Sequence, residues 1–158
     1  MPQQSPIELD EFDRQILRQV QADASISTQG LAERVGLSAS PCWRRLKRMQ
    51  EAGLITGQVA MVSPRALGLR AVAYLNITLV DHSEATIARF DAFVQCHDQV
   101  VECATITGSA DYLLKVFAAD PEALEQFIMR ELLALGVVRS TNTALVLRQT
   151  KYTTALPV

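Results

Sequence analysis

The segment from residue 27 to residue 54 constrains this chain more than any other part of the sequence. Its apolar residues recur at helical spacing on both sides of Gly36, which predicts a short helix, a tight turn and a second helix. The second helix carries four cations within five consecutive positions, and no acid interrupts residues 34–50. These cations are Arg44, Arg45, Lys47 and Arg48. Proteins use such a helix, turn and basic helix to place a side-chain row in the major groove of DNA.

Local signals extend this pattern to three helices. An apolar stripe predicts a helix over Leu9–Ala22, with acids at its N-terminal end, where the helix dipole favours them. Ser27 or Thr28 can cap the second helix. Ser38 can cap the third, whose first turn tolerates Pro41. The weakly alternating residues 55–62 then predict a wing or a connecting strand.

The third helix is predicted to have an apolar side and a polar side. Cys42, Leu46 and Met49 share the apolar side. Its inward direction favours Cys42 as an inert core thiol over a redox switch. Trp43 lies either on the DNA side or at the edge of the core, and Arg45 meets either a phosphate or an acid on a neighbouring helix. The residues expected at the DNA are Ser38, Ser40, Pro41, Trp43, Arg44, Arg45, Lys47 and Arg48.

A basic helix face is often merely solvated, and the formal net charge of −2 gives the DNA hypothesis no global support. The uninterrupted cations, the glycine turn and the nearby tryptophan favour DNA binding over solvation. Because the positive charge is local, we expect modest non-specific affinity per subunit and a need for oligomers.

After residue 70 the hydrophobic period changes at every predicted boundary. Strands are predicted at residues 71–80, 100–107, 112–118 and 137–147, and helices at residues 83–96 and after Asp120. This order predicts an α+β ferredoxin-like βαββαβ domain, an antiparallel sheet with two helices on one face. Pro64 and Gly68 mark a linker. The predicted organisation is a DNA-binding domain at 1–62, a linker at 63–69 and a second domain at 70–158, with a polar tail at 148–158 that is disordered unless a partner holds it.

Other features limit the classes of protein that fit. The three cysteines have no metal-type spacing and are odd in number, which predicts a reducing cytoplasm and no metal site. No apolar run approaches the roughly 20 residues of a membrane span, and no export signal is expected at residues 1–6. His82 and His97 lack a partner at catalytic spacing, and Cys96 beside His97 does not converge on one ion. We therefore expect no enzyme, no catalytic residues and no cofactor.

Four stretches carry a resemblance to a known family: Leu9–Leu17, Gly30–Ser38, Ser40–Met49 and Gly108–Lys115. The specific part is a Ser-Pro-Cys start to the basic helix combined with a later Gly-x-x-Asp-Tyr hairpin. On these motifs the chain resembles the Lrp/AsnC family of feast/famine transcription regulators. The resemblance implies a winged helix-turn-helix joined to a ligand-sensing ferredoxin-like domain, in a sequence-specific regulator of amino-acid or related metabolism.

The resemblance also implies partners. In the family, second domains pair sheet to sheet into dimers, often assembled into an octamer of four dimers, and a small effector, usually an amino acid, binds between dimers near the hairpin. Carried across by position, the effector residues are Gly108, Ser109, Ala110, Asp111, Tyr112, Thr141 and Thr143. The turn amides suit a carboxylate and Asp111 suits an ammonium group. Many members carry an acid where this chain has Ser109.

Two alternatives remain at this point. The hairpin residues also suit a plain structural turn. A stand-alone sensor that regulates a protein partner without binding DNA would leave the basic helix idle, and salt-dependent retardation of a duplex distinguishes it from a DNA-binding regulator.

Overall fold

The computed structural model describes residues 7–158, which divide into two units. The first unit runs to Ala60 and also takes in Lys151–Val158. The second unit is Met61–Thr150. Within the described range, no helix combines the length and the apolar character that crossing a membrane requires.

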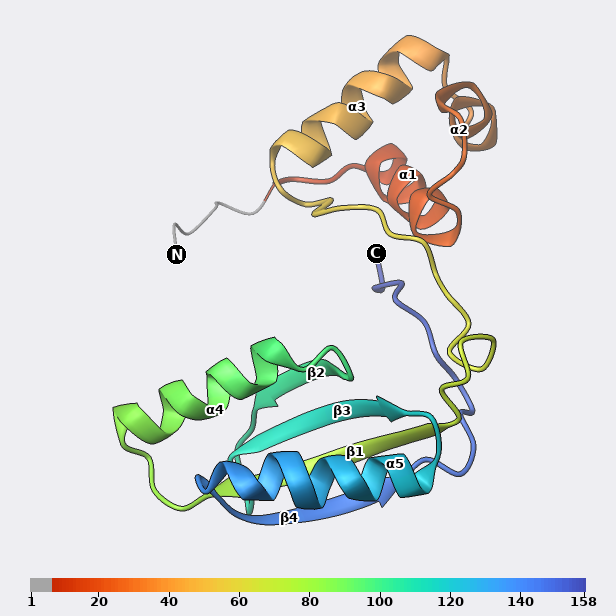
Figure 1. Ribbon diagram of the computed structural model, residues 1–158. Helices are drawn as coiled ribbons and strands as arrows, with labels where there is room; N and C mark the ends of the chain where they lie inside the picture. Colours follow the sequence, from red (N-terminus) through yellow and green to blue (C-terminus); the bar gives the residue numbers. More distant parts are fainter. Residues whose placement is uncertain (1–6) are drawn as a thin grey trace. The chain divides into compact units, whose positions relative to one another are not determined.

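The first unit contains the three expected helices, α1 (Glu11–Ala22), α2 (Thr28–Val35) and α3 (Ala39–Glu51) (Figure 1). Asp10 and Asp13 form a reciprocal capping box at the start of α1, and the Ser27 hydroxyl accepts from the Gly30 amide at 3.1 Å. Gly36 ends α2 with a φ of 71°, a conformation that glycine adopts without a Cβ clash. Ser38 stands at the N-cap of α3 but makes no side-chain capping bond.

These helices enclose a small core, because each turns an apolar stripe inward. Ile16, Leu31, Cys42 and Met49 are almost completely buried there. Residues 55–62 contain no strand, so the wing or connecting strand expected there is absent as a hydrogen-bonded element of the described chain.

The C-terminal tail differs from the sequence expectation, because α1 holds it. The Gln21 side-chain amide both accepts from the Leu156 backbone N–H at 2.6 Å and donates to the Leu156 carbonyl at 3.1 Å. Arg18 Nε donates to the Val158 carbonyl at 2.8 Å, and Val158 packs against the core of the first unit. Lys151–Val158 therefore joins the first unit and not the domain predicted at 70–158.

The second unit has the predicted βαββαβ order: β1 (Ala71–Leu79), α4 (Glu84–Cys96), β2 (Val100–Thr105), β3 (Tyr112–Ala118), α5 (Pro121–Gln126) and β4 (Val138–Leu145). After α5 the chain continues as a π-helical stretch, Phe127–Leu132, and a 3₁₀ turn, Leu133–Leu135. The strands form one sheet in the order β2-β3-β1-β4, with every neighbouring pair antiparallel. Figure 1 shows α4 and α5 on the same face of this sheet.

Strict alternation along β1 decides which residues enter the core. Ala73, Leu75 and Ile77 are fully buried and pack with residues of the two helices, among them Phe90 and Leu124. The side chains between them point to the other face of the sheet, where Tyr74 is only partly buried and the Lys115 Nζ lies 5.9 Å from its ring centroid. Neither α4 nor α5 covers this second face (Figure 1), on which the β1 residues are half-buried.

Candidate nucleic-acid interface and hairpin site

The helical period divides α3 into the two sides that the sequence predicts. Cys42 and Met49 are buried and Leu46 packs partly against the same core. Burial raises the pKa of the Cys42 thiol, because an apolar surrounding disfavours the thiolate. The polar side is exposed, and it carries Ser40, Trp43, Arg44, Lys47 and Arg48.

Trp43 and Lys47 form one part of the exposed side. The Trp43 side chain is 49% exposed, and the Lys47 ammonium lies 5.0 Å from its ring centroid. Lys47 also lies 3.6 Å from Glu51 one turn later, a surface pair that solvent screens. Trp43 is therefore presented at the surface and does not complete the core.

Arg44 is the cation of α3 that the described part of the chain leaves without an ion pair. It is exposed, and among residues 7–158 it makes no hydrogen bond or ion pair. A guanidinium presented in this way keeps all five of its donors for a phosphate or a base edge.

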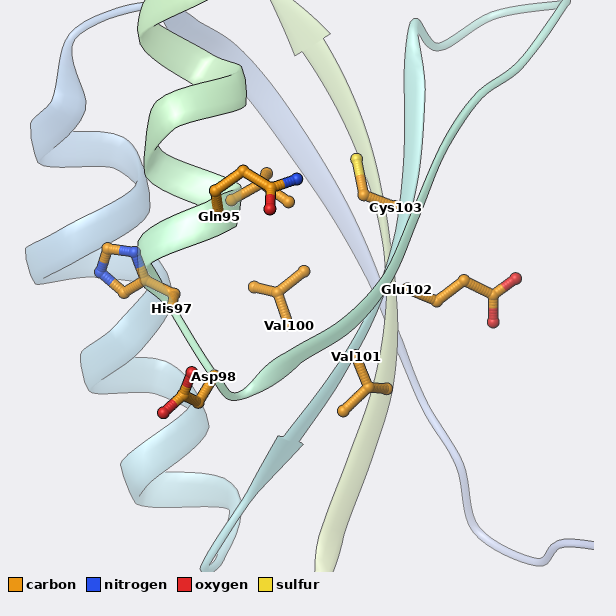
Figure 2. Close-up of a pocket in the computed structure, with 8 residues that line it drawn as sticks. Gln95, His97, Asp98, Val100, Val101, Glu102 and Cys103 are labelled. Carbon is orange, nitrogen blue, oxygen red and sulfur yellow. The ribbon is translucent and has the colours of Figure 1, made fainter. Parts of the chain in front are cut away.

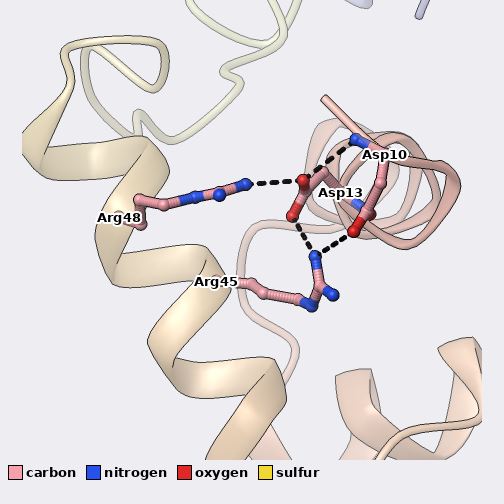
Figure 3. Close-up of polar contacts among 4 residues, drawn as sticks. All are labelled: Asp10, Asp13, Arg45 and Arg48. Atoms are coloured by element: carbon pink, nitrogen blue, oxygen red, sulfur yellow. Dashed lines mark hydrogen bonds and ion pairs between the residues drawn. The ribbon is translucent and has the colours of Figure 1, made fainter. Parts of the chain in front are cut away.

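Arg45 and Arg48 are held by two carboxylates of α1 and its cap (Figure 3). Arg45 Nη1 donates to Asp10 Oδ2 at 2.6 Å and to Asp13 Oδ1 at 2.9 Å. Arg48 Nη2 donates to Asp13 Oδ2 at 2.6 Å. The sequence left Arg45 to meet either a phosphate or an acid on a neighbouring helix, and in the structure it binds the acids. For Arg48, expected to face DNA freely, one nitrogen is already engaged within the subunit.

The two acids differ in burial and in their backbone partners. The Asp13 side chain is 1% exposed, whereas that of Asp10 is 51% exposed. The pKa of Asp10 is lowered mainly by the Asp13 backbone N–H, which donates a hydrogen bond to the charged carboxylate, and to a smaller extent by the Arg45 guanidinium. Asp13 also accepts from the Asp10 N–H at 3.1 Å, so its two oxygens receive three donors. The cluster therefore fixes the start of α1 against α3.

The predicted hairpin joins β2 to β3 and its tip is exposed at Gly108, whose φ of 123° suits only glycine. The Asp111 carboxylate receives two donors of its own chain. Its Oδ2 accepts from the Leu79 N–H at 2.8 Å, and its Oδ1 lies 2.8 Å from His82 Nε2. His82, followed by the Leu79 amide, lowers the pKa of Asp111. Asp111 thus fastens the hairpin to the end of β1, whereas the sequence suggested it for an ammonium group.

Register brings two of the other expected effector residues, Tyr112 and Thr141, into one row across the sheet. Tyr112 of β3 and Thr141 of β4 both pair with Ile77 of β1, and Thr143 pairs with Leu75. Tyr112 packs 4.7 Å from the Phe90 ring, and burial raises its phenol pKa. Thr141 Oγ1 is buried without a hydrogen-bond partner among the described residues, while Ser109 and Thr143 are exposed. Ala110 lies half-buried beside Asp111.

Sequence reasoning missed several residues of these two sites. His82 and Leu79 precede the hairpin by about thirty positions, and only the β1–β3 register places them beside Asp111. From the sequence alone, the helix dipole accounts for the acids at the start of the first helix, which include Asp10 and Asp13. Their spacing of three matches that of Arg45 and Arg48, a signal that two facing helix turns can pair.

A separate cavity of about 340 Å³ lies between the C-terminal end of α4 and β2 (Figure 2). Its lining includes His97 and Cys103, but the His97 ring is bound elsewhere. His97 Nδ1 lies 2.6 Å from the Phe93 carbonyl, and Nε2 lies 3.1 Å from Glu131. The imidazole therefore anchors the end of α4, and it stacks on Phe93 at 3.9 Å between centroids.

Comparisons with known proteins agree with both halves of this structure. Residues 9–56 match a winged helix-turn-helix DNA-binding family, and residues 72–156 match the Lrp/AsnC ligand binding domain. The DNA-binding transcriptional activator DecR of Escherichia coli K12 is 35% identical over 95% of this chain and 99% of its own. The transcriptional regulator AzlB of Bacillus subtilis is 38% identical over 96% of this chain and 97% of its own. A Neisseria meningitidis transcriptional regulator, solved as its L-Met complex, superposes with a TM-score of 0.92 at 34% identity. The match covers 95% of this chain and 97% of that regulator.

Proposed function

Because the chain belongs to the Lrp/AsnC family of DNA-binding transcriptional regulators, we propose that it reads DNA with α3 and responds to an amino acid bound at the hairpin of its second unit. The observation that carries the DNA part is Arg44. It stands exposed and without a partner among the described residues, on the same side as Trp43 and Lys47.

On this proposal the DNA surface is narrower than the basic run of the sequence. Ser38, Ser40 and Pro41 approach the duplex at the N-terminal turn of α3, the end that enters the major groove in this motif. Trp43, Arg44 and Lys47 follow along the exposed side, where Arg44 suits a guanine edge or a phosphate. Arg45 and Arg48 mainly hold α3 in place through Asp10 and Asp13.

Arg44→Ala tests this surface by electrophoretic retardation of a duplex across a salt series. If Arg44 neutralises one phosphate, the slope of log K against log salt becomes shallower by about 0.9. If Arg44 reads a base, binding weakens by about 1–3 kcal/mol and discrimination at one position relaxes. The control is Arg89→Ala, which removes the same charge from the exposed side of α4 and should leave binding unchanged. Unchanged retardation of Arg44→Ala contradicts the proposal.

The effector part is supported by geometry and by the relative solved with L-Met. The tip residues Gly108 and Ser109 are exposed, and the orphaned Thr141 hydroxyl gives a buried polar group that lacks a partner in one subunit. A bound amino acid supplies carboxylate and ammonium groups that satisfy such atoms. Asp111, held by His82 and Leu79, keeps the hairpin in shape for the ligand.

We further propose that two subunits pair through the half-exposed sheet face, that dimers associate as an octamer, and that the effector lies between dimers. Ligand then acts by changing how dimers associate, and hence the spacing of the α3 helices, which requires different affinity for the two assemblies. The proposed domains are residues 1–62, a linker at 63–69, and the sensing domain from residue 70, with its tail seated on α1. The site of action is the cytoplasm, where the DNA is.

Thermal-shift screening against the twenty amino acids tests the effector, because a ligand of the native state raises the melting temperature. Thr141→Val removes the orphaned hydroxyl at nearly constant volume, and should abolish the shift while leaving the melting temperature without ligand unchanged or higher. A shift that survives this substitution excludes Thr141 from the site. If no amino acid shifts the melting temperature, the effector proposal is refuted.

A further inference from the structure

Two of the four cations on α3 are already neutralised inside the subunit. Arg45 and Arg48 reach back to Asp10 and Asp13, and the three ion pairs measure 2.6, 2.9 and 2.6 Å (Figure 3). The other two cations have weaker compensation or none, since Lys47 has a screened partner at 3.6 Å and Arg44 has none among residues 7–158. The basic run is therefore divided into a paired half and an available half.

The pairing is firm because Asp13 is buried. A carboxylate that is 1% exposed depends on its three donors, and two of these are the guanidinium groups. Moving either guanidinium to a DNA phosphate would leave the carboxylate short of a partner in a site that water reaches poorly. The side chains of Arg45 and Arg48 are 29% and 49% exposed, so burial alone does not keep them from anions in solution. Their ion pairs with Asp10 and Asp13 do.

We propose that Asp10 and Asp13 set the specificity of DNA binding by withholding Arg45 and Arg48 from phosphates. Phosphate contacts supply sequence-independent affinity, whereas base contacts supply discrimination. An α3 that offered four free cations would bind any duplex tightly. The acid pair reduces the phosphate contacts and leaves discrimination to the residues around Arg44. This inference rests on the proposal that α3 meets the duplex.

Asp13→Asn and Asp10→Asn test the inference, because each keeps the size of the side chain and removes its charge. Asparagine also caps helices well, so the start of α1 is retained in Asp10→Asn. The assay measures binding to a random-sequence duplex and to an operator selected from a random pool, across a salt series. Glu11→Gln is the matched control, since Glu11 lies on the same helix and, among residues 7–158, forms its ion pair with Arg18 alone, at 3.1 Å.

For each guanidinium released, the slope of log K against log salt should steepen by about 0.9 on random DNA. At 0.1 M salt one added phosphate contact corresponds to about an eightfold gain in random-duplex affinity by that slope. The ratio of operator affinity to random affinity should fall in the same variants. Glu11→Gln should leave the slope and the ratio as they are in the wild type.

The outcomes separate this inference from the proposed function. If Arg44→Ala weakens binding but the aspartate variants leave the slope unchanged or shallower, the inference is overturned and the proposed function stands. If both duplexes lose affinity equally at constant slope, the acids only position α3, which also overturns it. If Arg44→Ala changes nothing, the proposed function fails first. Should Asp13→Asn fail to fold by circular dichroism, Arg48→Gln decides the question, because a withheld Arg48 makes no phosphate contact and its loss leaves the salt slope unchanged, whereas a shallower slope overturns the inference.

Discussion

Asp111→Ala should destabilise the second unit by about 2 kcal/mol, mainly because it removes a hydrogen bond to a buried backbone group. The Leu79 N–H donates to Asp111 Oδ2 at 2.8 Å, and Leu79 is only 1% exposed. Leaving a buried donor unpaired costs about 1–3 kcal/mol. The pair with His82, whose side chain is 68% exposed, adds at most about 1 kcal/mol because water and salt screen it.

The assay is urea unfolding at pH 7, followed by far-ultraviolet circular dichroism. Trp43, the single tryptophan, lies in the first unit, so its fluorescence serves as an internal reference for that unit. Asp111→Asn is the matched control, since its side-chain carbonyl can still accept from Leu79 and its cost should stay below about 1 kcal/mol. His82→Ala should cost no more than the exposed pair does.

The same prediction has a pH dependence with a definite sign. The folded-state pKa of Asp111 is lowered, so its contribution is present above the unfolded value near 3.9 and is lost as the pH falls through the folded value. The difference between wild type and Asp111→Ala should therefore be constant from pH 7 to about pH 5 and should shrink below about pH 4. If Asp111→Ala and Asp111→Asn cost the same, or neither moves the transition, the assigned role of the Leu79 hydrogen bond is incorrect.

Two further predictions concern the first unit. Gly36→Ala should destabilise that unit by about 1 kcal/mol, because a φ of 71° strains an alanine although its Cβ would meet no atom within 4 Å. The Trp43 fluorescence transition in urea measures this loss. An unchanged midpoint would show that α2 can end without a left-handed residue. Cys42 is 0% exposed, whereas Cys96 and Cys103 are exposed, so an alkylating reagent at pH 7.5 should modify Cys96 and Cys103 before Cys42. Burial raises the thiol pKa of both Cys42 and Cys103, so the expected order rests on access of the reagent, and equal rates at all three thiols would contradict the predicted core packing of α3.

Much of the fold follows from local chemistry that the sequence displays. The period of two along residues 71–79 and the period of 3.6 along α3 place apolar side chains on one side without reference to any distant residue. Gly36, Asp120 and Pro121 mark element ends for reasons of backbone geometry and capping that act within four residues. For this reason the element order and the two sides of α3 were predictable.

The tail and the wing show the limit of local chemistry. Residues 151–158 show neither helical nor strand periodicity, and α1 holds them through Arg18 and Gln21, more than 130 positions earlier. Residues 55–62 alternate as a strand would, but a strand also needs a neighbouring strand to complete its hydrogen bonds. The presence or absence of such a partner cannot be seen in the segment itself.

The sequence by itself determined the two-part architecture, the family, and the basic character of α3, because patterning and motifs are local and repeat along the chain. Only the tertiary structure decided which charges remain available. Arg44 and Arg45 are adjacent and chemically identical, yet one is free among the described residues and the other binds Asp10 and Asp13. Asp111 likewise binds Leu79 and His82 because strand pairing brings them within 2.8 Å. Electrostatic and hydrogen-bond partners depend on distances of a few ångströms, which folding sets between residues remote in the sequence.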